Sequence, residues 1–203
     1  MNSIAFMGLK GGNGATTSAH LACLGSAWSH RPAYFLHTDL REPLEAVQRP
    51  YKYIDARDQD YLINAFNKLS DSSGDHLVVI DSGGNRPKFD AWLSEAVDLV
   101  IIPTDLDPES VKLAVKHAND LSSKSDVKIL VRCPLRLGKD DQRIYDRIPS
   151  EFLLGRVDVV KASRSLKDDD DETGFQTPTS KVNNLARSVY RLLVDHFNPP
   201  IKL

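Results

Sequence analysis

At 203 residues the chain has the length of one α/β domain, and we expect residues 1–203 to form a single domain around one core. The hydrophobic content of 41% and the charged content of 27% are ordinary for a soluble globular protein. The net charge of −2 excludes a general attraction to nucleic acid or anionic membranes, so any contact with DNA requires a local basic patch.

The two cysteines and the N-terminus both predict a cytoplasmic protein. Cys23 and Cys133 lie far apart without a metal-ligand spacing, which favours free thiols in a reducing compartment. The apolar N-terminal segment is too short for a signal peptide and leads directly into a glycine-rich loop. No stretch approaches the about 18 apolar residues of a spanning helix, so we expect no membrane association.

Apolar runs alternate with helical periodicities along the whole chain. Strands are predicted at residues 3–7, 33–39, 51–54, 76–80, 98–103, 127–131 and 155–160. Helices are predicted at residues 16–28, 58–69, 88–96, 108–121, 139–148 and 182–197, the last of which is expected to close the core. This alternation predicts an α/β fold, with a mainly parallel sheet and helices on both faces.

A glycine-rich loop connects the first predicted strand to the first predicted helix. Glycines allow backbone N–H groups to turn toward an anion, and the helix N-terminus adds partial positive charge. Against the P-loop pattern G-x-x-x-x-G-K-[ST], we take Gly8 and Gly14 as the two glycines and Thr16 as the magnesium-binding hydroxyl. Ala15 stands at the lysine position. The loop therefore predicts a phosphate site without its mobile charge, and a turn without a ligand is the alternative.

Two aspartates each follow a predicted strand. Asp39 ends the second strand, and Asp81 follows the apolar run at residues 77–80, which is typical of a buried parallel strand. Open α/β sheets bind ligands at the carboxyl ends of their strands. We therefore predict that both carboxylates face the same site as the glycine loop. A turn-capping role for Asp39 remains the alternative.

The order of these features closely resembles the ParA/MinD family of deviant Walker A P-loop ATPases. The loop reads K-G-G-N-G-A-T-T from Lys10, close to the family's K-G-G-x-G-K-T-T, and Asp39 and Asp81 follow in the expected order. The resemblance covers essentially the whole chain. It implies the three-layer sandwich of a P-loop NTPase, in a short form without an N-terminal DNA-binding extension.

The resemblance implies ATP or ADP and Mg²⁺ as cofactors and a nucleotide-sandwich homodimer. Lys10 is then the residue that reaches the partner's phosphates, Asp39 orients the attacking water, and Thr16 and Asp81 hold the metal. The phosphate cradle is expected to consist of Gly11, Gly12, Asn13, Gly14, Ala15, Thr16 and Thr17. Arg132 and Pro134 follow the strand where the family often recognises adenine through an asparagine. Arg132 is therefore a candidate for base stacking, with an ordinary surface arginine as the alternative.

The family also implies a function: partitioning of plasmids or chromosomes, or positioning of other cellular cargo, with a partner protein that stimulates hydrolysis. Lys181, Arg187 and Arg191 of the last helix form a weak candidate patch for non-specific DNA, which would place the protein on the nucleoid. Solvated surface charges are the alternative. Unchanged DNA retention after charge reversal at Arg187 and Arg191 would exclude this patch.

Ala15 makes enzymatic activity uncertain, because the missing lysine would bridge the β- and γ-phosphates where charge builds up during transfer. We expect weak or absent ATP hydrolysis. An engineered Lys→Ala knockout and a naturally divergent member both remain open. The intact remainder of the loop favours the first, and the altered segments 39–41 and 82–84 favour the second. A nucleotide-independent pseudo-ATPase adaptor that binds DNA or a partner protein is the alternative function.

Overall fold

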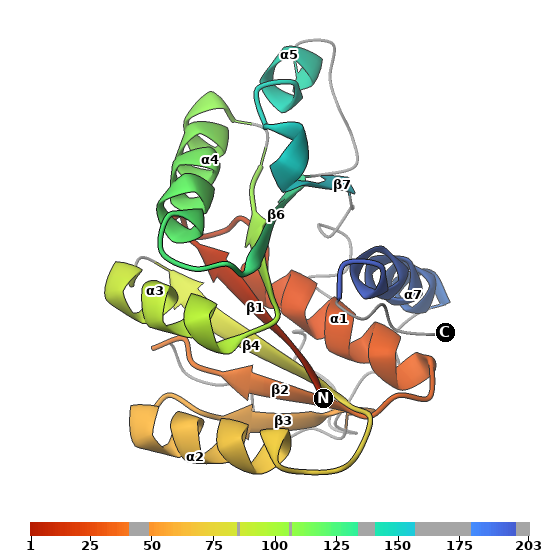
Figure 1. Ribbon diagram of the computed structural model, residues 1–203. Helices are drawn as coiled ribbons and strands as arrows, with labels where there is room; N and C mark the ends of the chain where they lie inside the picture. The colour runs from red at the N-terminus through yellow and green to blue at the C-terminus, as the bar shows by residue number, and fades with distance from the viewer. Residues whose placement is uncertain (41–48, 85, 106, 134–140, 157–179, 198–203) are drawn as a thin grey trace.

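A seven-stranded sheet, with every neighbouring pair of strands parallel, runs through the computed structural model (Figure 1). The structure describes residues 1–40, 49–84, 86–105, 107–133, 141–156 and 180–197. In spatial order the strands are β3 (Lys52–Asp55), β2 (Ala33–His37), β4 (Leu77–Gly84), β1 (Asn2–Gly8), β5 (Leu99–Pro103), β6 (Lys128–Cys133) and β7 (Leu153–Arg156). The helices are α1 (Ala15–Trp28), α2 (Gln59–Ser70), α3 (Pro87–Ala96), α4 (Pro108–Ser122), α5 (Asp141–Tyr145) and α7 (Ser180–Val194), with a 3₁₀ turn η1 at Ser150–Phe152.

The central strands are apolar on both faces because both faces are covered by helices. Successive side chains of a strand point to opposite faces. Accordingly, Ile4 and Phe6 of β1 belong to one core cluster, whereas Ala5 and Met7 belong to the other. This confirms the predicted fold class and explains why the strands appear as continuous apolar runs rather than as alternating patterns.

Two layers of helices enclose the sheet. The first cluster contains residues of α1 and α7, and the second contains residues of α2, α3 and α4, which lie on opposite sides of the sheet in Figure 1. The last helix therefore closes the core, as predicted. Its buried side chains are Val182, Ala186, Val189, Tyr190, Leu193 and Val194.

The predicted boundaries are least accurate near the end of the sheet formed by β7. The helix predicted at 139–148 is observed as α5 over Asp141–Tyr145, and it is followed by η1 after Pro149. The last strand begins at Leu153, two residues earlier than predicted, and its predicted end at 157–160 lies outside the described residues. These elements lie at the sheet edge, where partial burial weakens the periodic signal.

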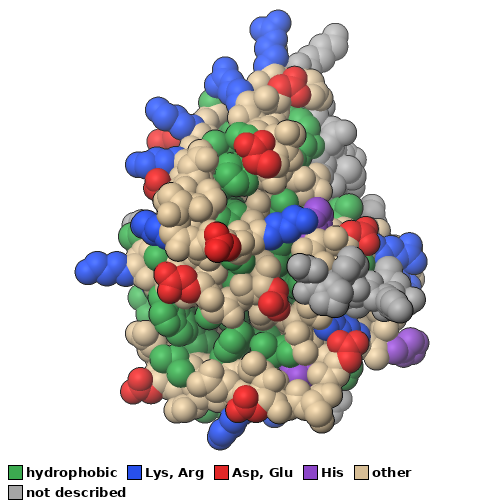
Figure 2. Space-filling model, viewed as in Figure 1, with side chains coloured by type: hydrophobic (Ala, Val, Ile, Leu, Met, Phe, Trp, Pro, Cys, Tyr) green, Lys and Arg blue, Asp and Glu red, His purple; other side chains and the backbone are tan. Residues whose placement is uncertain are grey.

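Surface charge is mixed, as the small net charge predicts. Figure 2 shows acidic and basic side chains interspersed over the viewed face rather than gathered into one field. Within the described ranges, no helix is both long and apolar enough to cross a membrane.

Gly25 sets the close approach of α1 and α7. A Cβ at this position would lie 2.6 Å from Tyr190 Cβ and 2.8 Å from the Ala186 carbonyl carbon, closer than real contacts allow. We expect Gly25→Ala to lower the free energy of unfolding by about 2–3 kcal/mol, because the two helices must separate. Urea denaturation measures this change. Gly74→Ala is the control, since its Cβ would meet nothing closer than the His76 ring at 3.5 Å, and an equal loss there would contradict the packing argument.

Candidate functional site

The topology brings the ends of β1, β2 and β4 to one edge of the sheet. β4 lies between β1 and β2, and Asp81 pairs in register with Phe6 on one side and His37 on the other. Just beyond β2, Thr38 donates from its backbone N–H and its hydroxyl to the Asp81 carbonyl, at 3.1 and 2.8 Å. The glycine loop and both predicted aspartates therefore lie side by side.

The glycine loop adopts a backbone conformation that favours glycine. Gly12 and Gly14 have φ values of 88° and 81°, in the left-handed region that side chains disfavour. Gly14 is the N-cap of α1 and supplies no side-chain cap, and the first turn contains no acidic residue. The first-turn N–H groups of this helix, together with the positive end of its dipole, suit an anion.

One assignment within the loop is wrong. Gly8 is the last residue of β1, and five residues separate it from Gly14, whereas the P-loop pattern has four between its glycines. Leu9 therefore stands at the first glycine position. The match over Gly14, Ala15 and Thr16 is unaffected by this correction.

Hydrogen bonds to three distant segments hold the loop in place. Lys10 donates to the Asp107 carboxylate at 3.3 Å and to the Ser110 hydroxyl at 3.0 Å, both at the start of α4. The Asn13 amide donates to the carbonyl of Pro103 at the end of β5, at 3.5 Å. In the single chain, Lys10 therefore points toward α4, and its predicted role toward a partner's phosphates remains a prediction.

Arg132 forms the third attachment and lies in an unexpected place. Its guanidinium is buried, with the residue only 3% exposed, and donates to the backbone oxygen of Asn13 at 2.5 Å. Burial lowers the pKa of Arg132 to about 10, although the charges of Cys133 and Asp105 act to raise that pKa. The residue is therefore not the ordinary surface arginine that was the alternative, and its predicted contact with a base stays a prediction. The other predicted base contact, Pro134, lies outside the described residues.

Asp81 is fully buried at the tip of β4. Neither of its carboxylate oxygens makes a hydrogen bond of standard geometry in the described part of the chain. Burial raises the pKa of Asp81, and the neighbouring charge of Asp39 adds to the rise, whereas the Thr16 hydroxyl, the charge of His37 and the Gly83 backbone N–H favour the ionised form. Burial of an ionised carboxylate that makes no hydrogen bond of standard geometry is costly, and a bound cation would offset that cost.

Asp39 packs directly against the segment that follows Asp81. A Cβ on Gly83 would lie 3.0 Å from the Cα and the Cγ of Asp39, so a side chain here would force Asp39 to shift. Gly83 also has a φ of 70°, which side chains disfavour. The glycine at position 83 is therefore favoured both by its backbone conformation and by the close approach of two strand ends.

Sequence patterns missed Arg86, the residue before α3. Its guanidinium donates to the Thr38 hydroxyl at 2.9 Å and to the Ser82 backbone oxygen, so it connects the ends of β2 and β4. Burial lowers the pKa of Arg86, and nearby carboxylates, including Asp39 and Asp81, oppose that shift. The arginine belongs to no known motif. Only its position before Pro87 at a helix start signalled a location at the strand ends.

The structure describes two of the three side chains in the predicted DNA-binding patch. Arg187 and Arg191 are exposed on α7, four residues apart and therefore on one side of the helix. The side chain of Lys181 lies outside the described part of the structure. DNA contact therefore remains a prediction.

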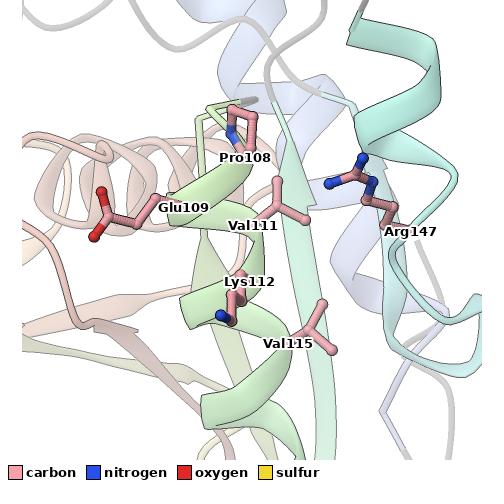
Figure 3. Close-up of a pocket in the computed structure, with 6 residues that line it drawn as sticks. All are labelled: Pro108, Glu109, Val111, Lys112, Val115 and Arg147. Carbon is pink, nitrogen blue, oxygen red and sulfur yellow. The ribbon is translucent and has the colours of Figure 1, made fainter.

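An apolar pocket of about 510 Å³ lies along α4, and none of the predicted site residues lines it. In Figure 3, Val111 and Val115 of α4 face the side from which Arg147 extends, whereas Glu109 points away. No sequence pattern indicated this pocket, since it forms between segments that are distant along the chain.

The residues present fit a magnesium ion that arrives with a nucleotide. Among the described residues, no group of three or more His, Cys, Asp or Glu side chains would hold a metal alone. Mg²⁺ generally binds through one or two carboxylates together with substrate phosphates. The buried carboxylate of Asp81 and the hydroxyl of Thr16 therefore match this donor set.

The sequence matches no protein-family model and no curated protein. The fold, in contrast, matches the α/β fold of ParA/MinD P-loop NTPases in solved structures. The MinC:MinD cell division complex of Aquifex aeolicus has a TM-score of 0.67 at 15% identity and covers 96% of each chain.

Two further structures have the same fold. An ATP complex of a McdA variant from Cyanothece has a TM-score of 0.63 at 13% identity, over 100% of this chain and 98% of that one. A plasmid partition protein of Borrelia burgdorferi has a TM-score of 0.58 at 14% identity, over 95% of this chain and 97% of that one. These similarities show the fold, which places the glycine loop and the two aspartates at a common edge.

Proposed function

We propose that this chain is a ParA-like, nucleotide-dependent switch that positions or partitions DNA or another cellular cargo. The observation that carries the proposal is the buried carboxylate of Asp81, which makes no hydrogen bond of standard geometry among the described residues and lies next to Thr16 at the end of the glycine loop. A structural aspartate in this position would be expected to have partners. A magnesium–nucleotide site explains both the burial and the absence of hydrogen bonds of standard geometry.

In this proposal each residue has a distinct role. The backbone N–H groups from Gly11 to Thr17 hold the phosphates of ATP or ADP, and Asp81 and Thr16 hold Mg²⁺, which adds positive charge beside those phosphates. Asp39 orients the attacking water. Because Ala15 replaces the mobile charge, binding is weak and hydrolysis slow or absent.

Homodimer formation requires Lys10 to change partners. The Lys10–Asp107 pair is half-exposed on both sides, and exposed ion pairs contribute little to stability because water screens them. Lys10 is therefore readily released from α4. We propose that it then contacts the phosphates bound to a second copy of the chain, which makes dimerisation dependent on nucleotide.

Sedimentation velocity with and without Mg·ATP tests this function. We expect Mg·ATP to shift the protein from monomer to dimer, and Lys10→Ala to abolish the shift while changing the affinity for Mg·ADP by less than about threefold, since that lysine acts across the dimer. Lys68→Ala, an exposed change on α2, is the control. Dimerisation of Lys10→Ala equal to that of the wild type would contradict the sandwich arrangement.

A nucleotide-independent adaptor is the second candidate, and Ala15 is the observation that favours it. Such a protein would keep the fold and bind DNA or a partner protein without a nucleotide cycle. The absence of nucleotide binding, both in the chain as it stands and after Ala15→Lys, would favour this candidate. The fold of a cell division complex and of a plasmid partition protein supports cargo positioning in either case.

A further inference from the structure

Arg132 is a buried cation attached to the backbone of the glycine loop. It belongs to β6, more than a hundred residues from the loop, and its Nη2 donates to the Asn13 carbonyl at 2.5 Å. The residue is 3% exposed, whereas Gly11 and Gly12 at the tip of the loop are exposed. Arg132 therefore contacts the loop from its inner side.

This contact fixes the orientation of the Asn13–Gly14 peptide unit. A trans peptide is planar, with its C=O and N–H pointing in opposite directions. Since the Asn13 carbonyl points inward to Arg132, the Gly14 N–H points to the opposite, outer side of the loop. In the described part of the chain that N–H makes no hydrogen bond. It is available to an anion bound in the loop.

The charge of Arg132 also strengthens that N–H as a donor. The guanidinium remains protonated near neutral pH despite its burial. A charge-assisted bond to the carbonyl polarises the peptide unit, and linked hydrogen bonds reinforce one another in a medium of low dielectric constant. The loop therefore gains positive potential at Gly14, one residue before the position where the lysine is missing.

We propose that Arg132 is a positioning residue that holds the Gly14 N–H toward a bound phosphate, and so allows a P-loop without its lysine to retain nucleoside diphosphates. This inference rests on the proposed function, since it requires a phosphate in the loop. It differs from the base-stacking role predicted from the sequence, because the guanidinium acts through the Asn13 carbonyl and does not touch the ligand.

Calorimetric titration of the full chain with Mg·ADP tests the proposal. We expect Arg132→Met to weaken Mg·ADP binding by about tenfold or more, since the Gly14 donor is no longer held in place. Arg143→Met, an exposed change on α5, is the charge-matched control and should bind as the wild type does. Thermal unfolding verifies that the variants are folded.

Amide NMR separates positioning from a merely structural role. In the wild type, Mg·ADP should shift the amide signals of Gly14, Ala15 and Thr16, whereas in Arg132→Met at saturating Mg·ADP only the Gly14 shift should be lost. Unchanged affinity in Arg132→Met, an unfolded variant, or loss of all three shifts would overturn the positioning role.

Ala15→Lys distinguishes this inference from the proposed function. If the wild type binds no Mg·ADP but Ala15→Lys does, the nucleotide site stands and the role of Arg132 is overturned. If neither binds, the proposed function fails together with the inference.

Discussion

Substituting lysine for Ala15 is expected to tighten the binding of Mg·ATP by about ten- to a hundredfold. Ala15 is the first residue of α1, directly after the left-handed Gly14, so a long side chain there starts at the phosphate cradle. A lysine would add one charge-assisted hydrogen bond, worth about 1.5–3 kcal/mol. Calorimetric titration of both proteins with Mg·ATP measures the difference.

The effect of Ala15→Lys on turnover should exceed its effect on binding. The added charge lies where negative charge develops during phosphoryl transfer, so it stabilises the transition state more than the bound nucleotide. Phosphate release should therefore become measurable in Ala15→Lys and stay near background in the unmodified chain. Ala15→Met supplies the length without the charge and is the control. An equal gain with methionine would mean that side-chain bulk, and not charge, was missing.

Replacing Asp81 by asparagine is expected to stabilise the nucleotide-free protein at pH 7, by about 1–3 kcal/mol. The pKa of Asp81 is raised, chiefly by burial, so its folded-state pKa lies above the unfolded value of about 3.9. The contribution of such a group to stability is complete below the unfolded pKa and is lost as the pH rises through the folded pKa. At pH 7 the ionised carboxylate therefore costs stability, and asparagine removes that cost.

Urea denaturation at several pH values measures this effect. The advantage of Asp81→Asn should shrink as the pH falls, because the wild-type carboxyl then becomes protonated. Asp98→Asn is the matched control, and it should lower the free energy of unfolding. Asp98 accepts hydrogen bonds from the Ser3 backbone and hydroxyl at 2.7 and 2.9 Å. A loss of stability in Asp81→Asn at pH 7 would mean that the carboxylate has partners that offset its burial.

Binding of Mg·ADP should reverse the order of stability of the wild type and Asp81→Asn. Saturating Mg·ADP is expected to raise the melting temperature of the wild type, because the ligand binds only the folded state. In Asp81→Asn the rise should be small and independent of Mg²⁺, since an amide is a poor ligand for that ion compared with a carboxylate. Equal magnesium-dependent rises in both proteins would exclude Asp81 as a metal ligand.

Much of the fold follows from local patterns. Continuous apolar runs such as residues 77–80 and 99–102 bury all their side chains only in a sheet that is covered on both faces. The layer structure was therefore predictable. Helix starts were equally clear where a capping aspartate preceded a proline, as at Asp107-Pro108. The edge elements α5 and β7 were less accurate because they are partly exposed and short.

The principal candidate residues were also predictable. Glycines before a helix and aspartates after buried strands are constrained by backbone geometry and by the common edge of a parallel sheet. The sequence therefore identified Gly14, Thr16, Asp39 and Asp81, which the structure places side by side. It did not identify Arg86, because nothing in the local pattern shows which way a side chain at a helix start will turn.

The sequence by itself determined the order of strands and helices, the glycine loop, and the alanine at the position of the P-loop lysine. These depend on residue type and local spacing, which a single chain displays directly. Only the tertiary structure decided that Lys10 contacts α4, that Arg86 connects two strand ends, and that Arg132 lies beneath the loop. Each of these contacts joins segments that are distant along the chain, and it exists because the strand order β2-β4-β1-β5-β6 brings their ends together. Burial then changes the chemistry of the same residues, since a charge such as that of Arg132 acts far more strongly away from water.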